Sequence, residues 1–94
     1  MTTIPALERE VVTEEVLGPL YALILFNDNV NTMDHVVNSL TRCVPDLDHG
    51  HAAEVMLEAH ANGMALVISC PHERAAQYRN CLESCGLTAT IEPA

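Results

Sequence analysis

Hydrophobic and polar positions follow one another along this chain in blocks of different period. Residues 21–26 form a continuous apolar run, YALILF, with the length of a strand buried on both faces or nearly so. From Thr32 onward the apolar residues instead recur every three or four positions, which is the spacing of an amphipathic helix. We expect this helix to have Thr32 as its N-cap, to carry Asp34 in its first turn and to end at Pro45.

A second helical pattern begins after the turn sequence PDLDHG. One side of it carries Ala52, Val55, Met56, Ala59 and His60. Asn62 and Gly63 end this helix, with glycine just past the last turn. The run MALVISC, residues 64–70, predicts a second strand, and Pro71 is placed at the first position of a third helix that ends at Gly86. Residues 87–92 alternate in the manner of a last strand.

The predicted order of elements is therefore β-α-α-β-α-β. It indicates an α/β (α+β) fold in which a small three-stranded sheet is covered on one face by three helices. The first residues mix acids with scattered valines and leucines, show no sustained period and end in Gly18-Pro19. We expect a flexible N-terminal extension over residues 1–18 and a single folded domain over residues 19–94, because 94 residues leave room for only one core.

The charge balance narrows the range of partners. The formal net charge is −9, and the chain has four arginines and no lysine. It lacks the basic face that binding to phosphates requires, so we expect neither nucleic acid nor an anionic membrane surface as a partner. The longest apolar run is too short to cross a bilayer. The acidity suits solubility, with attraction to a basic partner surface as the alternative.

The four cysteines have two possible uses, as disulfides or as metal ligands. The start of the chain leads into an acidic stretch unlike a secretory leader, so we expect reduced thiols in the cytosol. Cys81 and Cys85 are four residues apart, and His49 with His51 would complete a set of four zinc ligands. Their spacing matches none of the usual structural zinc patterns, and buried cysteines are commonly small core residues. We expect no metal and no other cofactor.

Catalytic motifs are absent from the sequence. It contains no G-x-S-x-G, no glycine-rich phosphate loop and no H-E-x-x-H, so we expect a protein that is not an enzyme. The triplet Asn27-Asp28-Asn29, between the first strand and the first helix, has a simple explanation as turn and capping residues. Taken singly, His60 is explained as a helix-end histidine packed near the sheet, and Met33 and Met56 as core residues.

Read together, two motifs resemble those of the ClpS family of adaptor proteins. The first is Asn27-Asp28-Asn29 followed by Thr32-Met33-Asp34, and the second is Met56-Leu57-x-x-His60-x-x-Gly63. The resemblance covers residues 20–94, and the segment FNDNVNTMDHV is most similar to variants from photosynthetic lineages. It implies an adaptor that binds the free N-terminal residue of N-degron substrates, with Phe, Leu, Tyr or Trp in first position. It also implies delivery to a Clp AAA+ ATPase, of the ClpA or ClpC type, and its ClpP protease.

The resemblance implies a site with two parts. The α-amine of a protein is mostly protonated at neutral pH and needs hydrogen-bond acceptors, for which Asn27, Asp28 and His60 are the candidates. The loop that carries Asn27 and Asp28 is supported by Asn29, Asn31 and Thr32. A hydrophobic pocket for the first side chain is lined by Met33, Val36, Val37, Met56, Ala59 and Leu87. Met33 is the expected gate, and it should crowd side chains that branch at the β-carbon.

Two positions depart from the family pattern near this site. Asn29 replaces the second acid of the loop and removes a carboxylate from the neighbourhood of the amine, which lowers the expected affinity or narrows the preferred side chain. Ala59 stands where a larger valine is common, and by volume alone it should deepen the pocket.

The surface for docking to the Clp ATPase carries over less completely. Glu73 matches the acid that the family places at the start of the third helix. Tyr78 stands where a lysine is usual, with Arg79 or Arg74 as its substitute. An ordinary solvated helix face explains these charged residues as well.

Two other classes of protein compete with the adaptor. One is a non-enzymatic α/β interaction module similar to the C-terminal domain of the ribosomal stalk protein, whose lysine-rich helical face has no counterpart here. The other is a small thiol or metal catalyst that uses Cys81, Cys85 and His51. The adaptor explains more of the sequence, and we expect it to be a monomer in the cytoplasm or, for a plastid form, in the chloroplast stroma.

Overall fold

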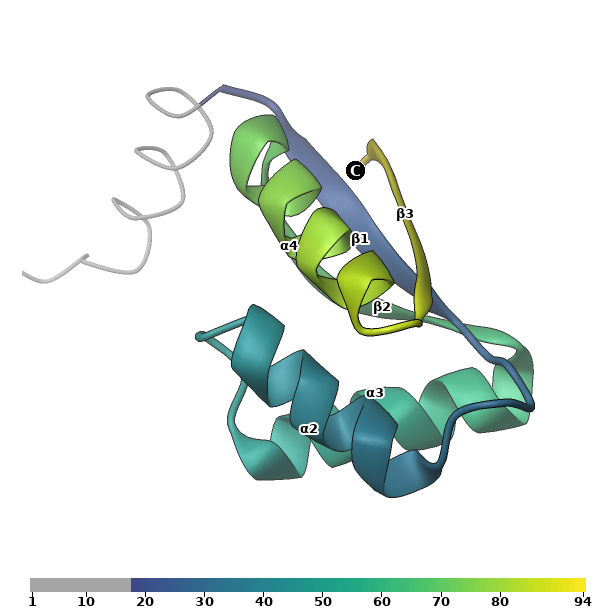
Figure 1. Ribbon diagram of the computed structural model, residues 1–94. Coiled ribbons are helices and arrows are strands. Elements are labelled where there is room, and N and C mark those ends of the chain that lie inside the picture. Colours follow the sequence, from purple (N-terminus) through teal and green to yellow (C-terminus); the bar gives the residue numbers. More distant parts are fainter. Residues whose placement is uncertain (1–17) are drawn as a thin grey trace, which may run out of the picture.

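The computed structural model describes residues 18–94, which form six elements in the predicted β-α-α-β-α-β order (Figure 1). They are β1 (Leu20–Phe26), α2 (Met33–Cys43), α3 (His49–Asn62), β2 (Met64–Pro71), α4 (His72–Ser84) and β3 (Thr88–Pro93). The extension predicted over residues 1–18 lies outside the described residues, apart from Gly18.

The three strands form one antiparallel sheet in the order β2-β1-β3, with β1 in the centre. In β1, Leu23 and Leu25 are buried, whereas the alternate residues Ile24 and Phe26 are only partly buried. Ile24 pairs with Leu66 of β2, which is half exposed. The prediction that this strand is buried on nearly both faces is therefore wrong. The helices cover one face of the sheet, so only every second residue of β1 is enclosed.

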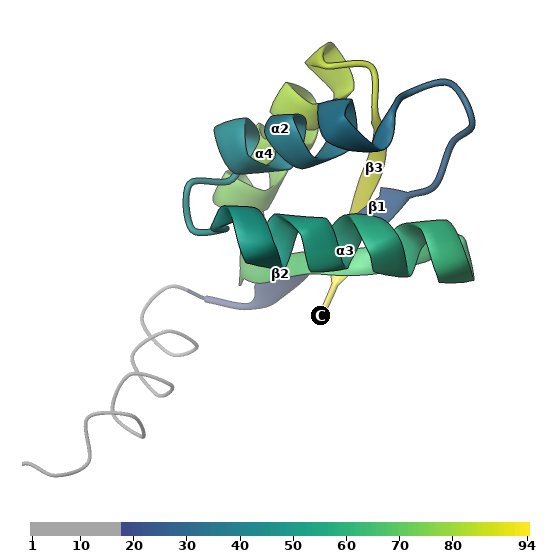
Figure 2. The same ribbon diagram turned by 90° about the horizontal axis from the view of Figure 1, so that it is seen from below.

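The three helices lie on the side of the sheet that carries Leu23 and Leu25, as predicted. α3 packs along β2, α4 packs against all three strands, and α2 packs against both helices (Figure 2). Leu40 of α2 and Leu82 of α4 are fully buried in the resulting core. None of the helices in residues 18–94 is long and apolar enough to span a membrane.

The ends of the helices follow the capping signals, with one exception. The Thr32 side chain accepts a hydrogen bond from the backbone N–H of His35, which confirms it as the N-cap of α2. Gly63 ends α3 in the left-handed conformation, with φ 91°. Pro71 differs from its predicted place inside the helix. It pairs with Leu20 as the last residue of β2, and its extended ψ of 152° delays the start of α4 to His72.

The expectation of four reduced thiols is wrong, because Cys43 and Cys81 form a disulfide. Cys43 is the last residue of α2 and Cys81 lies in the last turns of α4. The packing of these two helices brings the Cα atoms to 5.6 Å, although 38 residues separate the two cysteines in the sequence. Cys70 and Cys85 remain free, the first buried and the second partly buried.

Candidate functional site

The loop between β1 and α2 is built around the carboxylate of Asp28. Its Oδ1 accepts hydrogen bonds from the backbone N–H groups of Val30, at 2.9 Å, and Asn31, at 2.8 Å. The loop is also fixed at its start, where the N–H of Asn27 donates to the carbonyl of Gly63 at 3.0 Å. The bond from Asn27 to Gly63 joins the end of the central strand to the turn between α3 and β2, so two distant segments meet at this end of the sheet.

Asn31 connects this loop to a third segment. Its Nδ2 donates to Oδ2 of Asp28 at 3.1 Å and to the carbonyl of Gly86, in the turn between α4 and β3, at 2.9 Å. The hydrogen bond from the backbone N–H of Asn31 is the main cause that lowers the pKa of Asp28, partly opposed by desolvation. Asp28 therefore stays ionised at neutral pH and places a negative charge in the loop.

A cavity of about 240 Å³ opens between these three segments. It is lined by Leu25, Phe26, Asn27, Asp28, Asn29, Asn31, Met33, Val36, Met56, Ala59, His60 and Leu87. Among these residues Leu25, Ala59 and Leu87 are buried, whereas Asn27 and His60 are exposed. Met33 is 46 % exposed at the first position of α2. The cavity thus combines an apolar interior with polar groups toward the solvent.

Most of the residues singled out in the sequence lie around this cavity. Asn27, Asp28 and His60 all line it, although α3 brings His60 from a separate part of the chain. Five of the six hydrophobic candidates line it too, and the exception is Val37. Val37 is buried in the core between the helices and the sheet, because adjacent residues on a helix point about 100° apart and Val36 takes the cavity side.

Asn29 and Asn31 also line the cavity, and Thr32 caps α2. Leu25 and Phe26, the last two residues of β1, line the cavity as well, and they are not among the residues predicted from the sequence. Their position directly before Asn27 was a signal that could have identified them, because the strand must lead into the loop that borders the cavity.

The three candidate docking residues lie on α4, and none of them lines the cavity. Glu73 is exposed in the first turn of the helix, where a negative charge is favourable. Tyr78 packs against the hydrophobic core, and burial, followed by the negative charge of Asp46, raises the pKa of its phenol. The Arg79 guanidinium donates to Oδ1 of its neighbour Asn80 at 3.3 Å.

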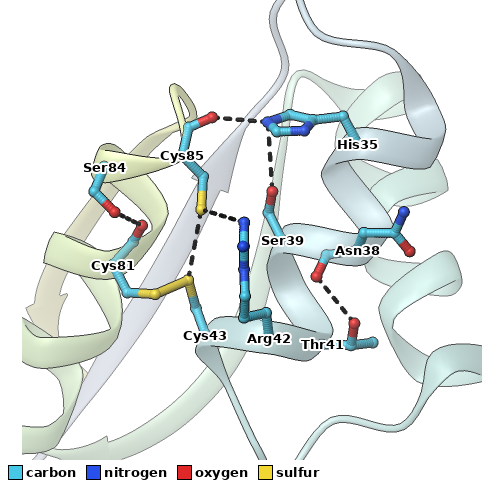
Figure 3. Close-up of a disulfide and its surroundings, with 9 residues drawn as sticks. All are labelled: His35, Asn38, Ser39, Thr41, Arg42, Cys43, Cys81, Ser84 and Cys85. Carbon is cyan, nitrogen blue, oxygen red and sulfur yellow. Dashed lines mark hydrogen bonds between the residues drawn. A yellow bond between two sulfur atoms is a disulfide. The ribbon is translucent and has the colours of Figure 1, made fainter.

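The candidate zinc set is not brought together in the described part of the chain. Cys81 and Cys85 are neighbours, but the third group near them is Cys43, and neither His49 nor His51 belongs to this cluster. Metal ions bind cysteine as the thiolate. With Cys43 and Cys81 joined, Cys85 is the single free thiol of the three (Figure 3).

The fold and the cavity together define a small α/β module in which hydrogen-bond acceptors are grouped beside an apolar cavity. The sequence profile described as "ATP-dependent Clp protease adaptor protein ClpS" matches residues 17–90. This chain belongs to the ClpS family, as the two sequence motifs predicted. Members of this family are adaptors of the Clp protease rather than proteases themselves.

Curated relatives agree with this assignment and with the predicted similarity to photosynthetic lineages. The ClpS adapter of Synechococcus elongatus is 43% identical over 84 residues, which cover 89% of this chain and 88% of that protein. The chloroplastic adapter CLPS1 of Chlamydomonas reinhardtii is 43% identical over 75 residues, covering 80% of this chain and 46% of that protein.

A solved structure supports the fold. ClpS2 of Agrobacterium tumefaciens, determined bound to L-phenylalaninamide, is similar to this chain with a TM-score of 0.73 and 26% identity. The match covers 81% of this chain and 98% of that one. The β-α-α-β-α-β arrangement with three helices and a three-stranded antiparallel sheet is therefore the ClpS fold.

Proposed function

We propose that this chain binds the free N-terminal residue of protein substrates in the described cavity, and that it prefers a bulky apolar or aromatic first side chain. The observation that carries the proposal is the grouping of Asn27, Asp28 and His60 beside an apolar cavity. The ClpS2 relative was determined with L-phenylalaninamide, a molecule that has a free α-amine and an aromatic side chain. The same two chemical groups are the ones that this cavity suits.

The acceptors fit an α-ammonium group. An ammonium offers three N–H donors, and Asn27 can accept through its amide oxygen and neutral His60 through a ring nitrogen. Asp28 supplies the negative charge. Its Oδ1 already accepts two hydrogen bonds and its Oδ2 one, so Oδ2 keeps a lone pair for the amine or for a bridging water. An acetylated terminus has lost its charge and cannot fill these acceptors.

The size of the cavity suits a single side chain. The whole cavity has a volume of about 240 Å³, below the roughly 300–1,000 Å³ of sites for drug-sized ligands. Met33, half exposed at the first position of α2, is the gate in our proposal, with Val36, Met56, Ala59 and Leu87 around the pocket. A substrate that branches at its β-carbon brings extra bulk close to Met33. We therefore expect Leu and Phe to bind better than Ile and Val.

Delivery to a Clp AAA+ ATPase completes the proposed role. The family assignment supports a Clp partner, of ClpA or ClpC type, and Glu73, Tyr78 and Arg79 form the proposed docking surface on α4. These residues are separate from the cavity, so substrate and ATPase can be bound at once. The relatives include bacterial and chloroplastic forms, and we propose the cytoplasm or the stroma as the location. We propose that the adaptor acts as a monomer.

The test is fluorescence anisotropy with labelled peptides that differ only in the first residue, which is Phe, Leu, Ile or acetyl-Phe. We expect binding of the Phe and Leu peptides that acetylation abolishes and that His60→Ala weakens. His49→Ala is the matched control, because His49 is an exposed histidine at the opposite end of the same helix and does not line the cavity. Equal binding of free and acetylated Phe peptides would overturn the proposal.

A further inference from the structure

Three sulfur atoms meet where the ends of α2 and α4 come together (Figure 3). The Cys43–Cys81 disulfide joins the helices, and Sγ of the free Cys85 lies 4.0 Å from Sγ of Cys43. The guanidinium of Arg42 donates to the Cys85 sulfur at 3.4 Å. Cys85 is partly exposed, whereas the other free cysteine, Cys70, is 4 % exposed and is not part of the cluster.

From this geometry we propose that Cys43, Cys81 and Cys85 form a thiol–disulfide exchange site that controls the loop beside the cavity. Deprotonated Cys85 attacks Sγ of Cys43, the Cys43–Cys81 bond breaks, and a Cys43–Cys85 disulfide forms. Cys81 leaves as a thiolate and takes up the proton that Cys85 gave to the solvent. One disulfide and one thiol are present before and after, so the step needs no oxidant or reductant.

Arg42 assists this step. The thiolate is the attacking species in exchange, and the Arg42 guanidinium places a permanent positive charge beside the sulfur that must become negative. The proposed location in the cytoplasm or stroma agrees with an exchange site, because disulfides in reducing compartments are usually transient, catalytic or redox-sensing rather than structural. A disulfide with a free thiol beside it brings the two reactants of the exchange together, and rotation of the Cys85 side chain has to bring its sulfur in line with the Cys43–Cys81 bond.

The exchange would be transmitted to the loop through the backbone of Cys85 and Gly86. The carbonyl of Cys85 accepts a hydrogen bond from Nε2 of His35, in the first turn of α2, at 2.7 Å. The carbonyl of the next residue, Gly86, accepts from Nδ2 of Asn31, which also holds Asp28. Bonding Cys43 to Cys85 instead of Cys81 moves the tether from inside α4 to its C-cap. We expect this change of tether to shift the carbonyls of Cys85 and Gly86, which position the loop.

The exchange itself is tested by trapping thiols in the oxidised full-length chain. The protein is held at pH 8, quenched with N-ethylmaleimide, and its disulfides are mapped by mass spectrometry. We expect two populations, one labelled on Cys85 and one labelled on Cys81 with a Cys43–Cys85 bond. Cys70→Ala is the matched control and leaves both populations in place. Label on Cys85 alone, with only the Cys43–Cys81 bond after hours of incubation, overturns the proposal.

The link to the loop is tested with two variants that each hold one bond. Cys85→Ser keeps Cys43–Cys81, and Cys81→Ser leaves Cys85 as the only partner for Cys43 within the cluster. We expect faster amide hydrogen exchange at Val30 and Asn31 in oxidised Cys81→Ser than in Cys85→Ser, because their N–H groups donate to Asp28. Equal rates in both variants overturn the link. This readout needs no peptide, so it stands even where the proposed function fails.

A peptide measurement adds the functional consequence, which rests on the proposed function. Oxidised Cys85→Ser should bind a Phe-first peptide at least as tightly as the wild type, which is a mixture of both forms, and Cys81→Ser should bind it about fivefold more weakly than Cys85→Ser, the effect of losing one hydrogen bond. Equal affinities of the two variants would contradict control of binding by the disulfide. Failure of the wild type to bind would instead refute the proposed function, and the thiol mapping would still decide the exchange.

Discussion

At the scale of single residues, Asp28 organises its own loop through three hydrogen bonds. Asp28→Asn keeps the shape and can still accept from the backbone of Val30 and Asn31. Its new amide nitrogen, however, faces Nδ2 of Asn31, donor against donor. We expect a loss of about 1 kcal/mol in the free energy of unfolding, measured by urea denaturation.

We also expect the effect of Asp28→Asn on the free energy of unfolding to depend on pH. The pKa of Asp28 in the folded chain lies below its usual value of 3.8, so ionised Asp28 stabilises the folded state. This contribution is fully present above pH 3.8 and is lost as the pH falls through the lower folded-state pKa. The stability difference between wild type and Asp28→Asn should be constant around neutrality and become smaller in acid. A difference that grows below pH 3.8 would contradict this role for the carboxylate.

Met33 is the residue that should set the choice among first side chains. Replacing it by alanine removes the thioether beside the cavity, and a β-branched first side chain should then no longer be crowded. We expect the wild type to prefer a Leu-first over an Ile-first peptide by about tenfold, within the range for one misplaced methyl group, and Met33→Ala to reduce this ratio several-fold. Anisotropy titrations with both peptides measure it.

Val30→Ala is the control for this measurement. Val30 belongs to the same loop, is 89% exposed and does not line the cavity. Its truncation should leave the ratio of Leu to Ile affinities unchanged. A ratio that changes equally in both variants would mean that loop conformation, rather than the Met33 side chain, determines the selectivity.

At the scale of elements, two glycines of α3 should respond in opposite directions to alanine. Gly63 ends the helix at φ 91°, and a Cβ there would meet no atom within 4 Å, so the cost of Gly63→Ala is conformational, about 1 kcal/mol. Gly50 lies in the first turn, where its Cβ would make an ordinary 3.7 Å contact with Asp48. Gly50→Ala should stabilise the protein by up to about 1 kcal/mol.

Thermal unfolding of the two variants checks this pair. A fall in Tm for Gly63→Ala and a rise for Gly50→Ala are expected. A rise for both would show that Gly63 does not need its left-handed conformation. Such a result would also mean that the hydrogen bond from Asn27 to the Gly63 carbonyl does not depend on a glycine at this position.

The elements could be predicted from the sequence because their signals are local. Periodicity located the strands and helices, and Thr32 and Gly63 marked helix ends through hydrogen bonds and φ angles that depend only on nearby residues. Pro71 was misplaced because its fixed φ suits both a strand end and a helix start. Pairing with Leu20, a long-range interaction, decides between them.

The candidate site was predictable to the extent that motifs carry it. The loop and the end of α3 hold Asn27, Asp28 and His60, and the two motifs indicate all three residues, which line one cavity. Val37 was included with Val36 because both are apolar, although the side of the helix that faces the cavity depends on how α2 packs. The Cys43–Cys81 disulfide could not be read from spacing, since it depends on the contact between α2 and α4.

At the scale of the whole molecule, this disulfide links α2 to α4, the first and last of the described helices, and it should make a large contribution to stability. In the chain-entropy description, closing a loop of 38 residues stabilises the folded state by about 4 kcal/mol, and native disulfides typically give about 2–4 kcal/mol. Domains of this size are stable by only about 5–15 kcal/mol. Reduction of the Cys43–Cys81 disulfide should therefore remove a large fraction of the free energy of unfolding.

The measurement is urea unfolding of Cys85→Ser with and without a reducing agent, since this variant cannot exchange its disulfide. We expect reduction to lower the free energy of unfolding by about 2–4 kcal/mol. Cys43→Ala in the same background should match the reduced protein and be insensitive to reductant. If reduction leaves the urea midpoint unchanged, the two helices are held by packing alone, and the bond between them can change partners without cost to the fold.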